Sequence, residues 1–230
     1  VSYFFRVLFL IIGPLIGSFV LNIAGFKPLF IVVSLLFFVS GLPLLKTKDT
    51  RKRIKFSIKQ VITDQRLKYG IGFFSFGADL GLWLIWSVFI YTSIIKGYTG
   101  LGLASSLVAL FMLLSTLVIG KLSDLYRNNL LRVGGVFSSA VWLFKSYASS
   151  VLHVNLLSSV YGFVSGLVAI PFTALGYDEA LDGDVLEFTI FREIMIHLGK
   201  IIVFILVLFI NDLQSTLLIG SITSLLYLIF

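Results

Sequence analysis

The 230-residue sequence is 58% hydrophobic and only 13% charged, and its mean hydropathy is +1.06. Soluble domains contain about 45 to 50% apolar residues, so this composition excludes an ordinary soluble domain and predicts a protein whose solvent is lipid. The absence of cysteine excludes disulfides and thiolate metal sites. The net charge is +7, and the positions of the basic residues along the chain indicate how the membrane segments are oriented.

Eight apolar stretches follow one another along the chain, separated by short polar breaks. About 20 apolar residues cross a bilayer as a helix, whereas irregular backbone or an open sheet edge cannot face lipid. Runs such as LFIVVSLLFF also lack the alternation of a transmembrane β-barrel strand. We therefore predict an all-α, polytopic transmembrane helix bundle. Its eight helices are expected at residues 3–23, 29–45, 71–95, 101–120, 133–150, 152–175, 188–210 and 213–230.

The first predicted helix contains Gly13, Pro14 and Gly17, and small residues four apart let helix backbones approach closely.

The chain starts at Val1 with apolar residues and ends at Phe230 inside an apolar run. We therefore expect a fragment whose N-terminal helices are missing.

A basic segment follows the second predicted helix and sets the orientation of the bundle. Between Lys46 and Lys68 there are nine basic residues and two aspartates, so the positive-inside rule predicts that this segment is cytoplasmic. Counting helices outward places the break GKLSDLYRNNLLR, residues 120–132, on the same side, together with both chain ends. Basic runs also occur in nucleic-acid-binding proteins, but among eight membrane segments we expect no nucleic-acid partner.

The third predicted helix places a carboxylate at membrane depth. Asp79, Trp83 and Trp86 have i, i+4 and i+7 spacing and share one face. Burial of a carboxylate is costly, so such residues usually mark proton, ion or substrate pathways, and indole faces attract cations. We expect a proton-carrying or cation-contacting site here. The alternative is a carboxylate that reaches water or a structural partner.

The break at 120–132 carries charges of both signs. Asp124 is expected to accept hydrogen bonds from a helix N-terminus or to pair with Arg127 or Arg132. The alternative is a solvated turn whose exposed ion pairs contribute about 0 to 1 kcal/mol.

The seventh predicted helix offers a second set of ionisable residues. Glu193, His197 and Lys200 lie on one face, which is expected to contact protein or a water-filled path. A proton relay centred on His197 is one reading, and a structural charge network is the other. Tyr161, in the sixth predicted helix, is expected to add a polar contact to a cavity between the helices. Metal binding by the acidic stretch YDEALDGDVLE is a weaker alternative, and we predict no metal site, cofactor or catalytic residue.

Two motifs resemble the major facilitator superfamily of secondary transporters. GKLSDLYRNNLLR is similar to the cytoplasmic loop signature G-x-L-x-D-(R/K)-x-G-(R/K)-(R/K), with Gly120, Leu122 and Asp124 matching and Arg132 as a later basic position. Leu125 and Arg127 depart from the signature, as is common in the copy that joins helices eight and nine. The stretch IIGPLIGSFVLNIAGFKPLF resembles the G-P-x-x-G pattern of helix five.

The resemblance implies that the chain corresponds to helices five to twelve of such a transporter. Residues 1–45 would be the last two helices of the N-terminal half, 46–69 the cytoplasmic linker, and 70–230 the six-helix C-terminal half. The implied function is alternating-access transport of a small-molecule substrate in the plasma (cell inner) membrane, coupled to protons or another ion. The G-P-x-x-G pattern favours proton-coupled efflux, as in an antiporter. A bracing role for Gly120, Asp124, Arg127 and Arg132 is implied in the same way.

Three other interpretations remain at this point. The chain could be an unrelated polytopic membrane protein, a non-transporting membrane scaffold or assembly subunit, or an integral-membrane enzyme. The enzyme is disfavoured because no phosphate loop, HExxH or GxSxG motif is evident.

Overall fold

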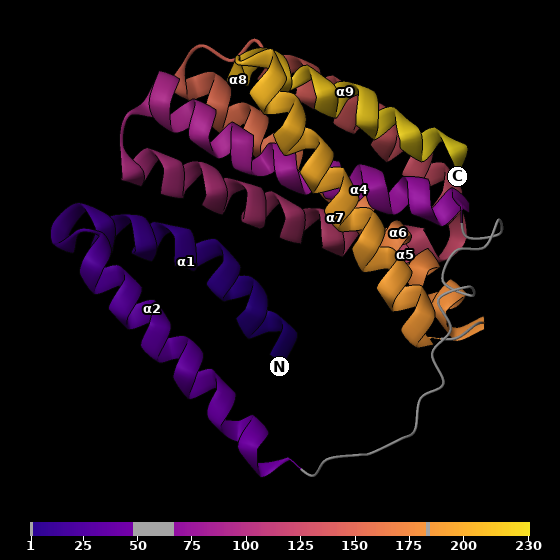
Figure 1. Ribbon diagram of the computed structural model, residues 1–230, viewed down its shortest axis with the longest axis horizontal. Coiled ribbons are helices and arrows are strands. Elements are labelled where there is room, and N and C mark those ends of the chain that lie inside the picture. Colours follow the sequence, from indigo (N-terminus) through magenta and orange to yellow (C-terminus); the bar gives the residue numbers. More distant parts are fainter. Residues whose placement is uncertain (1, 48–66, 183–184) are drawn as a thin grey trace.

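The computed structural model describes residues 2–47, 67–182 and 185–230, and all of its regular elements there are helical. Figure 1 shows the helices running back and forth along the longest axis of the molecule. Within the described residues, four helices are long and apolar enough to cross a membrane, and three shorter apolar stretches accompany them. The predicted all-α membrane bundle is therefore confirmed. Most of the predicted basic linker, residues 48–66, lies outside the described residues.

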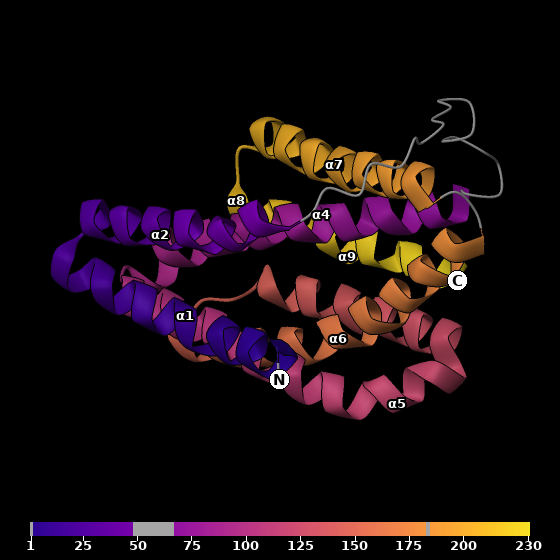
Figure 2. The same ribbon diagram turned by 90° about the horizontal axis from the view of Figure 1, so that it is seen from below.

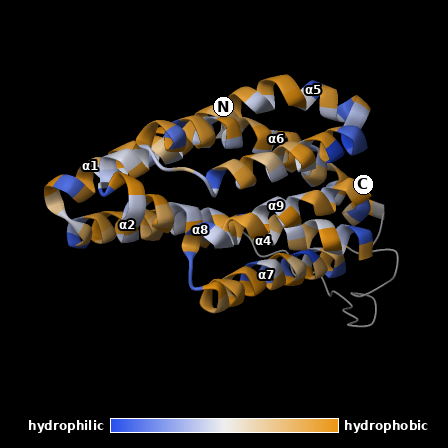
Figure 3. Cartoon of the chain, turned by 90° about the horizontal axis from the view of Figure 1, so that it is seen from above, coloured by the Kyte–Doolittle hydropathy of each residue, from blue (hydrophilic) through white to orange (hydrophobic). Residues whose placement is uncertain are grey.

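The first two helices form a hairpin at one side of the bundle (Figure 1). α1 covers Ser2–Ala24 and α2 covers Phe26–Gly41, followed by the short 3-10 helix η1, Leu42–Lys46. Gly25 makes the turn with φ 77°, a conformation that favours glycine. α2 has no buried residue, and Figure 3 shows much of its ribbon in the orange of hydrophobic residues. This helix therefore presents an apolar face to lipid or to further protein.

α4 and α7 cross at a pair of glycines. α4 spans Leu67–Phe89 and continues as the π-helical turn η3, Ile90–Ile95, while α7 spans Val185–Ile210. They lie side by side in Figure 2. A Cβ on Gly77 would lie 2.0 Å from the carbonyl oxygen of Ile196, and one on Gly199 would lie 2.2 Å from that of Phe74. Only glycine permits this backbone contact.

α5 spans Tyr98–Lys145 and contains the fourth predicted helix, 101–120, and residues 133–145 of the fifth. Its backbone leaves the helical region at Tyr126, with φ −132° and ψ 36°. We call residues 98–125 the first arm and residues 127–145 the second arm. Figure 2 shows the ribbon turning back at this bend. With α5 counted as two passes, the structure agrees with the predicted eight membrane segments.

The expected loop at GKLSDLYRNNLLR is wrong in its local structure, because this stretch is helical except at the bend. Between Lys121 and Arg132 there is neither glycine nor proline, and Lys, Leu and Arg are good helix formers. Ser123 and Leu131 are buried and anchor the two sides of the bend. Polar sequence between apolar runs therefore marks a change of direction here without an irregular loop.

α6 spans Val151–Asp182 and packs along both arms of α5. A Cβ on Gly162 would lie 2.3 Å from the Val108 carbonyl oxygen, and one on Gly166 would lie 2.2 Å from the Ser115 hydroxyl. The helix extends beyond its predicted end at residue 175, so most of the expected acidic loop is helical.

The last membrane segment is built from three short helices: α8, Leu213–Thr216; α9, Leu218–Ser224; and η4, Leu225–Ile229. Asp212 caps α8 by accepting hydrogen bonds from the backbone N–H groups of Gln214 at 3.2 Å and Ser215 at 2.8 Å. The hydrogen bonds from Ser215 and Gln214 lower the pKa of the Asp212 carboxyl.

α1 packs against the first arm of α5 through a glycine on the partner helix. A Cβ on Gly102 would lie 2.4 Å from the Ser18 hydroxyl and 2.7 Å from the Pro14 carbonyl oxygen. Gly13 and Gly17, which sequence analysis assigned to packing, have nothing within 4 Å of an added Cβ among the described residues. The close approach of α1 therefore depends on Pro14, Ser18 and Gly102.

We predict that Gly77→Ala lowers the thermal unfolding midpoint of the purified protein, measured by circular dichroism in detergent. The new methyl group would meet backbone rather than a movable side chain, and overpacking of this kind costs about 1 to 3 kcal/mol. Gly120→Ala is the matched control, because its Cβ has open space and Ala is about 0.5 to 1 kcal/mol more favourable than Gly inside a helix. Equal midpoints for the two variants would contradict the tight crossing.

Candidate functional site: a charged centre within an aromatic cage

Asp79 lies on the wall of a cavity of about 180 Å³ between α4, α5, α6 and the last segment. It is twelve residues beyond the start of α4 at Leu67, or about 18 Å along a helix that rises 1.5 Å per residue. The carboxylate is therefore far from the start of the helix. The other lining residues are Phe76, Leu80, Val108, Met112, Ser138, Tyr161, Ser165, Val168, Ala169, Ser224 and Tyr227.

Both carboxylate oxygens of Asp79 accept a hydrogen bond from an aromatic side chain. The Trp142 indole Nε1 donates to Oδ1 at 2.7 Å, and the Tyr161 hydroxyl donates to Oδ2 at 2.5 Å. Trp142 belongs to the second arm of α5 and Tyr161 to α6, so one carboxylate joins three helices. Hydrogen bonds in a water-poor interior are strong because the low dielectric strengthens their electrostatics.

The ammonium group of Lys145 is surrounded by four aromatic rings. Its Nζ lies 3.5 Å from the ring centroid of Tyr161, 4.0 Å from that of Trp142, 5.0 Å from that of Trp86 and 5.2 Å from that of Trp83. We call these four rings the aromatic cage. All the distances are within the roughly 6 Å range of cation–π attraction. Lys145 is 0% exposed, and its Nζ has no hydrogen-bond partner among the described residues.

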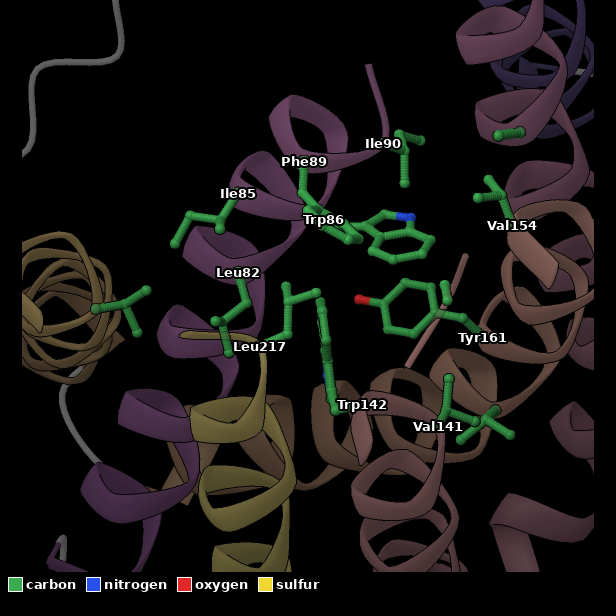
Figure 4. Close-up of a cluster of buried hydrophobic side chains, with 14 of the residues drawn as sticks. Leu82, Ile85, Trp86, Phe89, Ile90, Val141, Trp142, Val154, Tyr161 and Leu217 are labelled. Atoms are coloured by element: carbon green, nitrogen blue, oxygen red, sulfur yellow. The ribbon is translucent and has the colours of Figure 1, made fainter. Parts of the chain in front are cut away.

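The rings of the cage also pack against one another. Trp83 stacks on Tyr161 with centroids 5.4 Å apart and an interplanar angle of 8°, while Trp142 meets Tyr161 edge-on at 5.4 Å and 68°. Figure 4 shows Trp86, Trp142 and Tyr161 gathered in this part of the core. Gly220 of α9 supports the arrangement, because its Cβ would lie 2.5 Å from Trp142 Cγ. The side chains are thus fixed by contacts from four membrane segments.

The cage places two opposite charges in one aromatic environment. Trp142 and Tyr161 each donate a polar hydrogen to Asp79 and present a ring face to Lys145. No ion pair within 4.0 Å joins Asp79 to Lys145 in the part of the chain that the structure describes. The two charges therefore compensate each other through the intervening rings. An isolated charge at this depth would be much more costly.

Three of the site residues expected from sequence, Trp83, Trp86 and Tyr161, meet next to Asp79. The Glu193, His197 and Lys200 stripe does not join them by any hydrogen bond or ion pair within the described ranges. Glu193 pairs with Arg192 at 2.9 Å, and the two line a separate cavity of about 230 Å³. The His197 ring Nδ1 lies 2.8 Å from the Glu193 carbonyl oxygen. Glu193 and His197 are exposed and Lys200 is half-buried.

The charges near the α5 bend pair differently from the expectation. Arg127 forms an ion pair with Asp178 of α6, and Arg132 donates to the Phe230 carbonyl oxygen at 3.2 Å. Asp124 makes neither a hydrogen bond nor an ion pair with any described residue, so its predicted pairing with Arg127 or Arg132 is wrong. These two interactions near the α5 bend therefore join α5 to α6 and to the last membrane segment.

Sequence analysis missed Lys145 and Trp142, the two residues that complete the centre. A visible signal existed, because Lys145 lay inside the predicted apolar helix 133–150 with Trp142 three residues before it. An intramembrane lysine on the same helical face as a tryptophan is an unusual pair. The described residues contain no group of His, Cys, Asp and Glu that could hold a metal ion.

Long apolar helices packed around buried charges define a polytopic membrane protein, and the family to which it belongs is one of transporters. A sequence model of the Major Facilitator Superfamily matches residues 2–186, and the chain belongs to this family. No curated protein matches the chain.

Tyr161→Phe should lower the stability of the purified protein by about 1 to 3 kcal/mol, the typical cost of leaving a buried polar group without its partner. In an Asp79→Leu background the same change should cost measurably less, because leucine offers the Tyr161 hydroxyl no acceptor. A double-mutant cycle of thermal unfolding midpoints in detergent tests this coupling. Tyr147→Phe is the control, since Tyr147 is exposed. Additive effects of Tyr161→Phe and Asp79→Leu would argue against the hydrogen bond.

Proposed function

We propose that this chain forms part of a secondary transporter that moves a small solute by alternating access, with Asp79 as its proton-carrying group. One observation carries the proposal: the same carboxylate lines a cavity and accepts hydrogen bonds from two other helices. Protonation or a change of partner at Asp79 would alter contacts between α4, α5 and α6 together. Coupling requires such a link between occupancy and helix packing.

The proposed domain division follows the expected one. Residues 1–45 would be the last two helices of an N-terminal half, 46–69 a linker, and 70–230 a C-terminal half. The hairpin of α1 and α2 supports this division, because α1 reaches the remainder of the bundle mainly through the first arm of α5. In transporters built from two halves, the substrate binds between them near the midplane of the membrane. The missing helices of the same protein would then complete the binding site.

Direction and location are proposed on narrower grounds. The Gly13, Pro14 and Gly17 pattern supports proton-coupled efflux, with a proton entering as the solute leaves. The basic residues between Lys46 and Lys68 support a cytoplasmic location for that segment and for both ends of this chain. The membrane that we propose is the plasma (cell inner) membrane. With this orientation, Lys145 lies toward the outer face and the bend at Tyr126 lies at the cytoplasmic face.

The proton-carrying role predicts that Asp79→Asn diminishes the titrating carboxylic-acid C=O band in infrared spectra recorded at two pH values. An amide does not titrate, so the contribution of Asp79 should be lost from the band, whereas the other carboxyl groups of the chain keep theirs. Glu193→Gln is the matched control, because it removes a carboxylate from the exposed face of α7 and should leave the contribution of Asp79 in place. A band that is undiminished in Asp79→Asn would exclude this residue as the proton carrier.

The ion pair between Arg127 and Asp178 is the second element of the proposal. It ties α5 to α6 at the predicted cytoplasmic end, where opening of the cavity would require the two helices to separate. The side chains are 29% and 58% exposed, so water weakens their attraction and the pair contributes about 0.2 to 1 kcal/mol. We therefore propose that the ion pair modestly favours the conformation in which the cavity is closed to the cytoplasm, without preventing its opening.

Arg127→Gln should increase the cytoplasmic accessibility of the central cavity about two- to fivefold, the population shift that corresponds to the free energy of such a pair. The chain contains no cysteine, so Ala169→Cys in the cavity wall provides a single site for a thiol reagent. The rate of its modification measures accessibility.

Two further variants make this accessibility test specific. Asp124→Asn should leave the rate unchanged, because Asp124 has no partner among the described residues. The charge swap Arg127→Asp with Asp178→Arg should restore the rate of the parent. Equal rates of thiol modification in Arg127→Gln and the parent would contradict this role of the ion pair.

A further inference from the structure

α9 lies along the second arm of α5 in a fixed register. The hydroxyl groups of Ser139 and Ser221 are hydrogen-bonded at 2.9 Å, and a Cβ on Gly135 would lie 2.8 Å from the Ser224 carbonyl oxygen. Trp142 is three residues beyond Ser139, so it lies on the same face of the second arm. The contact between α9 and Trp142 is therefore the third in one row.

Gly220 is the residue of α9 that meets the Trp142 ring. A Cβ on Gly220 would lie 2.5 Å from Cγ and 2.7 Å from Cδ2 of the indole, and 3.0 Å from Leu82 Cδ1. Carbon atoms in contact are about 3.5 to 4.0 Å apart, so a side chain at this position would displace the indole by about 1 Å. Glycine is therefore required at residue 220 for the observed position of the ring.

The position of this ring determines a hydrogen bond to the candidate proton carrier. Trp142 Nε1 donates to Asp79 Oδ1 at 2.7 Å, and Cγ and Nε1 belong to the same five-membered ring. N–H···O bonds extend to about 3.2 Å, so a shift of about 1 Å away from the carboxylate would break this one. A shift toward the carboxylate would bring the two groups into collision. The hydrogen bond therefore depends on the space at Gly220, although Gly220 and Asp79 belong to different helices.

The face that carries Gly220 continues along the last membrane segment into the wall of the central cavity. Ser224 and Tyr227 follow at i+4 and i+7, are buried, and line that cavity. The Ser75 hydroxyl donates to the Thr223 carbonyl oxygen at 2.7 Å, which joins α9 to α4. One buried face thus contacts the Trp142 donor at one end and forms part of the cavity wall at the other.

We infer that Gly220 is a positioning residue for Asp79: it holds the Trp142 indole where its N–H group donates to the carboxylate, and it makes this hydrogen bond depend on the position of α9. The inference rests on the proposed function in one respect, because Asp79 is the proposed proton carrier. The hydrogen bond is detected at the Trp142 N–H group, without transport or proton titration. A failure of positioning by Gly220 and a failure of proton carriage by Asp79 are therefore separate results.

The test is a two-dimensional NMR spectrum of the indole N–H groups of the 230-residue chain in detergent micelles. The chain has three tryptophans, and the Trp142 signal is assigned by its loss in Trp142→Phe. Asp79→Leu removes the acceptor and gives the position of this signal without the hydrogen bond. Gly220→Ala should move the Trp142 signal most of the way to that position. An unchanged Trp142 signal in folded Gly220→Ala would overturn the inference.

Gly176→Ala is the matched control for a glycine-to-alanine change inside a helix. Gly176 is buried in α6, but its Cβ would approach the Phe73 ring only to 3.6 Å, an ordinary contact distance. This variant should leave the Trp142 signal in place. A shift equal to that of Gly220→Ala would indicate a general loosening of the bundle and would contradict the positioning role.

Ser221→Ala covers the case in which Gly220→Ala does not fold. It removes the hydrogen bond to Ser139 without adding an atom against the indole, so α9 is held less firmly on the second arm. The Trp142 signal should move in the same direction as in Asp79→Leu, by a smaller amount. Ser159→Ala is the control, because that hydroxyl is hydrogen-bonded within α6, and it should cause no shift. An unchanged signal in Ser221→Ala would contradict the dependence on α9.

Discussion

The interior of this bundle depends on the placement of one carboxylate and one ammonium group where water is scarce. Asp79 receives two aromatic donors, and Lys145 is wrapped by the rings of those same donors. Neither charge is stable alone at this depth, and each depends on side chains from α4, α5 and α6. The helix contacts at Gly220, Gly162 and Gly77 bring these elements close enough for the arrangement to form. The compensation of the two charges therefore depends on the same contacts that pack the helices together.

This dependence explains which features sequence analysis could predict. The apolar runs are local properties of the chain, so the membrane helices and the family were within reach. Asp79, Trp83 and Trp86 share one helix face and could be recognised from spacing alone. Lys145 could not be assigned in the same way, because its surroundings come from three helices. Its position inside the predicted helix 133–150 marked it as unusual but did not show which side chains surround it.

The bend in α5 shows a different limit. Polar residues between 120 and 132 correctly indicated a reversal between two membrane passes, but polarity does not determine backbone geometry. The residues around Tyr126 favour helix, so the chain reverses with one non-helical residue. The pairing of Arg127 with Asp178 was equally invisible, because the stretch around Asp178 was expected to be an irregular loop. The extension of α6 to Asp182 brings that carboxylate to the bend.

The two arms of α5 also connect distant parts of the bundle. Its first arm contacts α1 at Gly102. It is also hydrogen-bonded to α1 through Ser106, whose hydroxyl donates to the Ile11 carbonyl oxygen at 2.6 Å. Its second arm carries Trp142 and Lys145. A single stretch of chain therefore joins the α1 hairpin to the charged centre, and its two arms change direction relative to each other only at Tyr126.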